Sequence, residues 1–355
     1  MTLPQNKNWP DIARAIKQFA HDLGFQQAGI TDVDLSVAEG HLNRWLAEGR
    51  HGDMQWMQHH GSKRCHPEQL VPGTLRIISV RLDYLPANSV QMQAVLDDPG
   101  RAYVSRYALG RDYHKLMRKR LQQLARLVEQ HYGAFGYRVF VDSAPVMEKP
   151  LAEKAGLGWI GKHTNLLNSS AGSWFFLGEI YTDMPLPVDE PEQGHCGDCQ
   201  ACMDVCPTRA ITAPYQLDAR LCISYLTIEH EGAIPVELRP LIGNRVYGCD
   251  DCQICCPWNR FADFTEEEDF HPRHALDNIS LLELFSWDKA TFLANTQGSA
   301  IRRIGHDRWL RNIAVALGNA TTNKDRIIKA LLNTHSNVSK MVQEHIDWAI
   351  KQLEA

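Results

Sequence analysis

The 355-residue sequence lacks any run close to the roughly 20 apolar residues that a membrane-spanning helix needs. Its opening residues, MTLPQNKNWPD, also lack the apolar segment of a secretion signal. Disulfides form mainly in oxidising compartments, so these absences argue against a disulfide framework for the ten cysteines. We therefore expect a cytoplasmic protein without a membrane partner.

The sequence also has no excess of positive charge, because its net charge is −5. This total gives no global signature of nucleic-acid binding, although it leaves room for local basic patches. No Gly-x-Gly-x-x-Gly motif joins an expected strand to a helix. The similar stretch from Gly156 to Gly161 follows an expected helix, so we interpret it as a tight turn rather than a dinucleotide-binding loop.

The length and the hydrophobic content of 44% predict two or three globular units. Helical periodicity predicts helices over residues 10–24 and 112–131, and β-like runs occupy 76–82, 137–142 and 174–181. This pattern predicts an α/β (α+β) domain over residues 1–190. A cysteine-rich module over 191–262 follows. Residues 263–355 then predict short amphipathic helices at 281–285, 309–317, 327–332 and 342–353, arranged as in HEAT repeats.

Nine of the ten cysteines lie between Cys196 and Cys256. The first run, Cys196-x2-Cys199-x2-Cys202-x3-Cys206-Pro207, has the bacterial ferredoxin spacing, in which three thiolates bind one 4Fe-4S cluster and the fourth binds another. Structural zinc sites favour two well-separated Cys-x2-4-Cys pairs, which this run does not resemble. The run therefore predicts two clusters and an electron-transfer role.

The second run, Cys249-Asp-Asp-Cys252-Gln-Ile-Cys255-Cys256-Pro257, leaves one ligand open. Either Cys255 or the isolated Cys222 completes the set, and the spacing favours Cys222, because the adjacent side chains of Cys255 and Cys256 diverge in a short turn. Cluster 1 then has Cys196, Cys199, Cys202 and Cys256 as ligands, and cluster 2 has Cys206, Cys222, Cys249 and Cys252. Cys65 and Cys255 have no assigned role.

A polar residue ends the expected strand 137–142. Asp142 lies where ligands dock on α/β sheets, and its carboxyl group suits proton transfer. The alternative is a structural role at the start of the next helix, which Ser143 could cap and Pro145 could open.

The segments VDSAPVMEKPLAEKAGLGWIGKHTN, CGDCQACMDVCPT, LCISYLTIE and YGCDDCQICCPWN, in this order, resemble the epoxyqueuosine reductase family over nearly the whole chain. The resemblance implies a core similar to cobalamin-dependent reductive dehalogenases, two 4Fe-4S clusters that supply electrons to cobalamin, and a HEAT-like region that holds tRNA. It also implies Cys222 as a cluster ligand and Asp142 as proton donor. By the same resemblance, the cofactor contacts are Arg64, Asp142, Asn165, Ser224 and Asp250.

The implied reaction removes the epoxide oxygen of epoxyqueuosine in the tRNA anticodon loop. An acid working near neutral pH would need a raised pKa, which we expect at Asp142 from burial beside Val141 and Val146. For tRNA phosphates we expect a patch of Arg302, Arg303, Arg308 and Arg311. We interpret the basic residues at 115 and 118–120 as a solvated helix face.

Two other functions fit the cluster motifs alone. One is a ferredoxin-like electron carrier, and the other is a corrinoid reductase acting on a small substrate such as an organohalide. The large α/β domain argues against the first, and the arginine-bearing helical region argues against the second. We expect a monomer that receives electrons from an external donor.

Overall fold

The computed structural model describes residues 7–355 and contains a four-stranded antiparallel sheet. Its strands follow the order β1 (Gln27–Thr31), β2 (Arg76–Asp83), β7 (Phe175–Thr182) and β4 (Tyr137–Phe140). The three predicted β runs are confirmed, but 76–82 and 137–142 are not neighbours, because β7 lies between them. The expected strand–helix–strand layer is therefore an antiparallel sheet.

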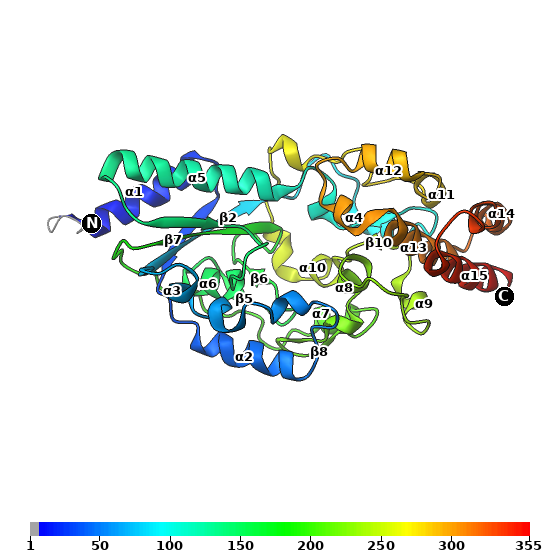
Figure 1. Cartoon of the computed structure of the whole chain (residues 1–355), viewed down its shortest axis with the longest axis horizontal. Coiled ribbons are helices and arrows are strands. Elements are labelled where there is room, and N and C mark those ends of the chain that lie inside the picture. The colour runs from blue at the N-terminus through cyan, green and yellow to red at the C-terminus, as the bar shows by residue number, and fades with distance from the viewer. Residues whose placement is uncertain (1–6) are drawn as a thin grey trace.

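Two long helices, α1 (Trp9–Asp22) and α5 (Tyr113–Tyr132), cover one face of the sheet (Figure 1). Both confirm the predicted helices. Their buried side chains, including Ile16 and Leu121, join Val80 and Ile180 of the sheet in one apolar cluster. Asp112 caps α5, because its carboxylate accepts a hydrogen bond from the backbone N–H of His114. This cap fixes where the helix begins.

The opposite face of the sheet packs against α6 (Glu148–Lys154), with α2 (Ser36–Ala47) and α3 (Pro67–Leu70) nearby (Figure 1). A hairpin of β5 (Trp159–Ile160) and β6 (Leu166–Leu167) follows α6. The turn from α6 into β5 needs glycine at Gly158, whose φ is +146° and where a Cβ would lie 1.9 Å from the Leu167 carbonyl oxygen. The segment is thus a tight turn, as predicted.

The cysteine-rich region has only short elements, consistent with cluster ligands taking the place of a large apolar core. In chain order they are α7 (Ala201–Val205), β8 (Ile211–Ala213), β9 (Gln216–Leu217), α8 (Ile223–Ile228), α9 (Arg239–Ile242), β10 (Arg245–Tyr247) and α10 (Asp251–Ile254). β10 pairs in parallel with β3 (Tyr103–Val104), which lies shortly after α4 (Met92–Leu96). The region is therefore tied to the N-terminal part of the chain.

The C-terminal part consists of α11 (Leu281–Phe285), α12 (Lys289–Asn295), α13 (Gly305–Gly318), α14 (Lys324–His335) and α15 (Lys340–Glu354), which form one end of the elongated molecule (Figure 1). All four predicted helices are present. Their apolar core also takes in Val104, Leu109 and Tyr247 from outside 263–355. The HEAT-like arrangement and the three domain boundaries stay predictions. No helix within 7–355 combines the length and apolar character needed to cross a bilayer.

Candidate functional site

Asp142 lies in a loop between β4 and α6 and has a left-handed backbone, with φ of 45°. Its Oδ2 accepts a hydrogen bond from the Tyr113 hydroxyl at 2.8 Å and lies 3.2 Å from His114 Nε2. Its backbone N–H donates to Glu148 Oε1 at 2.5 Å. Side chains from the start of α5 and the start of α6 thus fix both the carboxylate and the backbone of this residue.

The predicted cap at Ser143 is wrong. The Ser143 hydroxyl donates to the Val141 carbonyl oxygen at 3.3 Å, and the helix begins only at Glu148. The residues between form an irregular loop, so Pro145 does not lie in a first helical turn. This loop leaves Asp142 free of a capping role and turns its side chain toward α5.

The expectation of a raised pKa at Asp142 is also wrong. Its side chain is 55% exposed. Burial alone would raise the pKa of this carboxyl, but the hydrogen bonds from His114 and Tyr113 outweigh that effect, so the pKa lies below its ordinary value. Asp142 is therefore a carboxylate in the free site.

His114 lies between two carboxylates. Its Nδ1 lies 2.6 Å from Asp112 Oδ1, and its Nε2 faces Asp142. Burial lowers the pKa of the imidazole, but hydrogen bonds to the two carboxylates dominate and raise it to about 9. The ring is therefore an imidazolium at neutral pH, between two carboxylates.

Tyr113 keeps its own proton. Burial, followed by the charge of Asp142, raises the pKa of this phenol well above its ordinary value. Its ring stacks on Phe176 with centroids 3.8 Å apart, which holds the hydroxyl on Asp142. Sequence reasoning missed both Tyr113 and His114, although they directly follow the helix-capping Asp112 at the end of α5 that faces Asp142.

The four cysteines predicted for cluster 1 line a single cavity of about 50 Å³, together with residues such as His163 and Trp258. Cys202 is 8% exposed. Burial, followed by the charges of Cys196, Cys256 and Cys199, raises its pKa to about 11. Thiols that oppose one another's ionisation need a cationic centre to become thiolates, so this donor set fits an iron–sulfur cluster.

The structure also brings the second set together. The charges of Cys222 and Cys206 act on Cys252, and Cys249 packs in the same apolar cluster as Cys222. Cys255 has the first-set thiols Cys202 and Cys256 as its strongest charged neighbours, although its own charge also acts on Cys252. The assignment of Cys222 as the ligand stays a prediction, and this arrangement favours it.

The predicted cofactor contacts differ in burial and in how many hydrogen bonds their side chains already make within the protein. Arg64 is 6% exposed, and its Nε has no hydrogen-bond partner among residues 7–355. Asn165 and Ser224 are half-buried. Asp250 accepts hydrogen bonds from Tyr103, Ser105 and the backbone of Arg106. A carboxylate accepts about four, so the Asp250 side chain has a structural task and little capacity left for a cofactor.

The predicted arginine patch needs correction. Arg311 is fully buried, and its guanidinium donates to the carbonyl oxygens of Leu226, His230 and Gly232, so it cannot contact tRNA. Arg308 likewise donates to backbone carbonyls and is half-buried. Arg302 and Arg303 are the exposed residues of a 3-10 helix, Ala300–Ile304, and Arg303 pairs with Glu229. Only these two remain candidates for phosphate contact.

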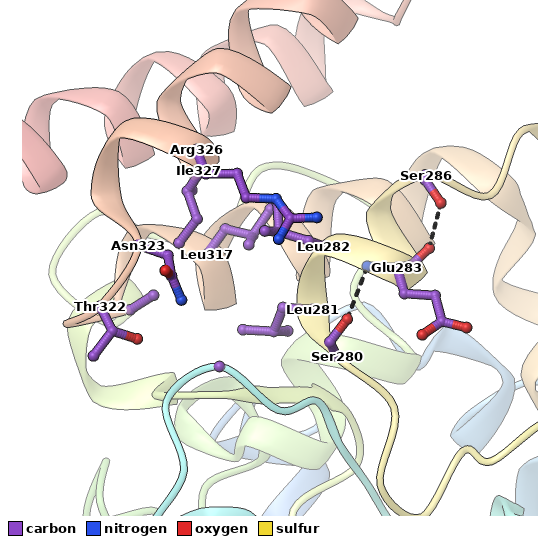
Figure 2. Close-up of a pocket in the computed structure, with 12 residues that line it drawn as sticks. Ser280, Leu281, Leu282, Glu283, Ser286, Leu317, Thr322, Asn323, Arg326 and Ile327 are labelled. Carbon is purple, nitrogen blue, oxygen red and sulfur yellow. Dashed lines mark hydrogen bonds between the residues drawn. The ribbon is translucent and has the colours of Figure 1, made fainter.

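A separate cavity of about 420 Å³ lies between α11 and the start of α14 (Figure 2). Leu281, Leu282 and Ile327 form its apolar wall, and Asn323 and Arg326 contribute polar groups. None of the predicted site residues lines it. The cavity is therefore distinct from the Asp142 site and from both cysteine sets.

Known proteins and family models match this chain in both its N-terminal and its cysteine-rich regions. Residues 64–143 match the family model described as "Epoxyqueuosine reductase QueG, DUF1730", and residues 195–259 match "4Fe-4S double cluster binding domain". The epoxyqueuosine reductase of Pseudomonas aeruginosa is 59% identical over 354 residues, which cover 99% of this chain and 98% of that protein. The chain belongs to the epoxyqueuosine reductase family. The second match confirms the prediction of two 4Fe-4S clusters.

Solved epoxyqueuosine reductases share the fold. That of Bacillus subtilis, in which an aspartate-bearing catalytic loop is swung out of the active site, is 26% identical and covers 98% of this chain and 91% of its own, with a TM-score of 0.86. Another solved structure holds an epoxyqueuosine-modified tRNA-Tyr stem loop. It is 24% identical and covers 98% of this chain and 100% of its own, with a TM-score of 0.83. The family fold therefore extends over nearly the whole chain.

Proposed function

We propose that this chain reduces epoxyqueuosine in the anticodon loop of tRNA to queuosine, in the cytoplasm, using two 4Fe-4S clusters and cobalamin. The observation that carries the proposal is the full-length similarity to an epoxyqueuosine reductase, at 59% identity. The geometry agrees with it, because a proton-holding site lies beside a pair of cysteine sets. The electron carrier and the small-substrate reductase of the sequence analysis are not favoured.

The second cysteine set is the one adjacent to the acid site. The charges of both Cys252 and Asp142 act to raise the pKa of Lys149, which is next to Glu148 on α6. Electrons from an external one-electron donor therefore enter at cluster 1 and leave from cluster 2. A monomer suffices for this path, because one chain provides both cysteine sets and the acid site.

Residues around Asp142 fit a large polar cofactor. Arg64, on whose charge Asp142 acts, has a buried Nε without a hydrogen-bond partner within 7–355. Buried polar atoms are nearly always satisfied, so this guanidinium nitrogen calls for a polar ligand or ordered water. Arg64, Asn165 and Ser224 would hold the amide-bearing periphery of cobalamin, and Asp142 would face its reactive side. Bound cobalamin would supply a low-valent cobalt that accepts electrons one at a time.

The chain's own task is proton delivery. Asp142 Oδ2 faces Tyr113 and His114, whereas Oδ1 accepts no hydrogen bond from residues 7–355 and is free for the substrate oxygen. The imidazolium of His114 supplies the proton that Asp142 transfers as the C–O bond breaks. The aspartate-bearing catalytic loop of the Bacillus subtilis enzyme supports a mobile carrier of this kind.

tRNA approaches over the 3-10 helix that carries Arg302 and Arg303. The charge of Arg303 acts on Asp142, which supports a tRNA path near the acid site. The helices of residues 263–355, in a HEAT-like arrangement, support this surface.

The test is anaerobic turnover of epoxyqueuosine-containing tRNA with cobalamin and a chemical reductant, followed by nucleoside mass analysis. The product nucleoside should be lighter by one oxygen atom. Omitting cobalamin or the reductant should abolish the change, and an unchanged nucleoside mass in the complete mixture would reject the proposal.

A further inference from the structure

His163 is a buried side chain that the proposed function has not used. It lies in the turn between β5 and β6 and is 4% exposed. Its Nδ1 accepts a hydrogen bond from the backbone N–H of Asn165, and the two nitrogen atoms are 3.1 Å apart. A backbone N–H can only donate, so Nδ1 carries no proton. The imidazole in this arrangement is therefore neutral, with its proton on Nε2.

The Nε2–H group of His163 has no hydrogen-bond partner among residues 7–355, although it is buried. Buried polar groups in folded proteins nearly always have a partner. The backbone contact at Nδ1 fixes the tautomer, so rearranging the protons on the ring cannot remove the unsatisfied donor. His163 therefore presents a donor that calls for an acceptor.

The ring of His163 lines the cavity of about 50 Å³ that the four cysteines predicted for cluster 1 also line. The remaining lining residues are Lys162, Leu167, Ala201, Pro257 and Trp258. None of these five side chains has a hydrogen-bond acceptor, since lysine and tryptophan only donate and the others are apolar. The cysteine sulfurs are therefore the side-chain acceptors that this cavity offers to Nε2–H.

The β5–β6 turn is fastened to the first cysteine run. Within the turn, the backbone N–H of Gly161 donates to the Asn165 carbonyl oxygen at 2.8 Å. Lys162 Nζ donates to the carbonyl oxygens of Gly197 and Cys199, at 2.6 and 2.9 Å. These contacts hold the imidazole beside the cavity and leave the lysine amino group bound to the backbone.

We propose that His163 donates a hydrogen bond from Nε2 to a sulfur atom of cluster 1 and thereby raises the reduction potential of that cluster. A 4Fe-4S cluster becomes more negative when it gains an electron, and hydrogen bonds to its sulfur atoms stabilise this reduced form. His163 keeps its proton throughout, because it contributes only a hydrogen bond. The electron comes from the external donor and passes on to cluster 2.

A raised potential suits the place of cluster 1 in the proposed electron path. Cys199 is exposed, so this cluster is the one that an external donor can approach. A higher potential makes it a better acceptor for that donor. The inference rests on the proposed function only for this role in turnover. The potential itself can be measured without tRNA or cobalamin, so its failure is distinct from failure of the proposed reaction.

The first test is a redox titration of the full-length protein with both clusters, followed by electron paramagnetic resonance. His163→Asn keeps an acceptor for the Asn165 N–H but has no donor at the ε position. We expect the ratio of reduced to oxidised cluster 1 at a fixed potential to fall about tenfold, because hydrogen bonds to charged groups are the stronger ones. His163→Gln, whose amide can donate from the ε position, should restore most of the ratio.

His195→Asn is the matched control. His195 directly precedes Cys196, but it is exposed and does not line the cavity. Both titration steps of this variant should match those of wild type. If His163→Asn keeps its full iron content and both steps are unshifted, the inference fails. It also fails if that variant instead binds cobalamin more weakly with both steps unshifted, because His163 would then be a cofactor contact.

The second test uses the wild-type sequence, so it decides the matter even if His163→Asn fails to assemble cluster 1. Protein labelled with ¹⁵N-histidine is reduced and measured by pulsed electron paramagnetic resonance. We expect a ¹⁵N coupling to the reduced cluster, together with a proton coupling that disappears in D2O. His195→Asn should keep both couplings. A wild-type spectrum without a histidine nitrogen coupling would overturn the inference.

Discussion

His114 Nε2 lies 3.2 Å from Asp142 Oδ2, while Nδ1 of the same ring lies 2.6 Å from Asp112 Oδ1. The imidazole is thus held between two carboxylates, and both contacts favour its protonated form. In the proposed reaction, this arrangement would let a site with an ionised Asp142 deliver a proton near neutral pH. We therefore propose the His114–Asp142 pair, rather than either residue alone, as the acid.

The first prediction concerns pH. The pKa of His114 in the folded chain is about 9, above the ordinary value of 6.5, so its ion pairs stabilise the fold fully below about pH 6.5 and are lost as the pH rises through about 9. We expect kcat to fall over the same alkaline range. His114→Asn should lower kcat and remove this limb from the pH–rate profile. An unchanged alkaline limb in this variant would exclude His114 as the proton source.

The second prediction concerns Asp142. Asp142→Asn keeps the size of the side chain but cannot carry a proton from His114 to the substrate. General acid–base catalysis contributes roughly 100-fold to 10,000-fold, so we expect a loss of at least about 100-fold in kcat. Cluster absorbance and cobalamin binding should match wild type, which separates a chemical defect from misfolding. Full activity would remove Asp142 from the reaction.

The third prediction concerns the disputed ligand of cluster 2. Cys222→Ser should lose about half of the protein-bound iron, because cluster 2 lacks its fourth thiolate. Cys255→Ser is the matched control and should keep the full iron content, since the charges of Cys202 and Cys256 on Cys255 place it beside the first set. Iron analysis and electron paramagnetic resonance after anaerobic reconstitution make the comparison. The reverse pattern would assign Cys255 as the ligand.

Much of the fold could be predicted because its elements have strong local signals. The apolar spacing of α1 and α5 and the β-like runs of β2 and β7 predict those elements directly. β1 was missed because it is short and contains Gly29, where a Cβ would lie 2.0 Å from the Ala155 carbonyl oxygen. This glycine serves close packing against the residues after α6, a tertiary requirement that the strand's own sequence does not reveal.

The candidate site was predicted only in part, because some of its features have local sequence signals and others depend on tertiary packing. Cysteine spacing is a local signal, so the ligand sets could be proposed from sequence. The pKa of Asp142 depends on Tyr113 and His114, which are about thirty residues earlier in the chain and reach it only after α5 packs on the sheet. Arg311 shows the opposite error, because its neighbours Leu310 and Ile313 are buried as well and only the folded helix shows this.

The fourth prediction concerns the surface for tRNA. Arg302 is exposed, and within residues 7–355 its side chain donates only to the Leu293 carbonyl oxygen, so Arg302→Ala should leave the fold unchanged. Each lost phosphate contact lowers the slope of log affinity against log salt by about 0.7 to 0.9. We therefore expect weaker tRNA binding at low salt and a flatter salt dependence, measured by fluorescence anisotropy with a labelled anticodon stem loop. Lys351→Ala, on the exposed side of α15, is the control and should leave the slope unchanged.

The fifth prediction tests the corrected role of Arg311. Its guanidinium satisfies three backbone carbonyl oxygens of residues 226–232 and the side chain of Asn312, and burial lowers its pKa to about 9. Arg311→Met fills similar volume but leaves these acceptors unsatisfied, and each unsatisfied buried group costs about 1–3 kcal/mol. We expect a loss of about 3 kcal/mol or more in unfolding free energy, seen as a lower midpoint in anaerobic urea unfolding. Arg302→Met should not shift the midpoint. If Arg311→Met instead keeps wild-type stability and flattens the salt dependence of tRNA binding, Arg311 belongs to the tRNA surface after all.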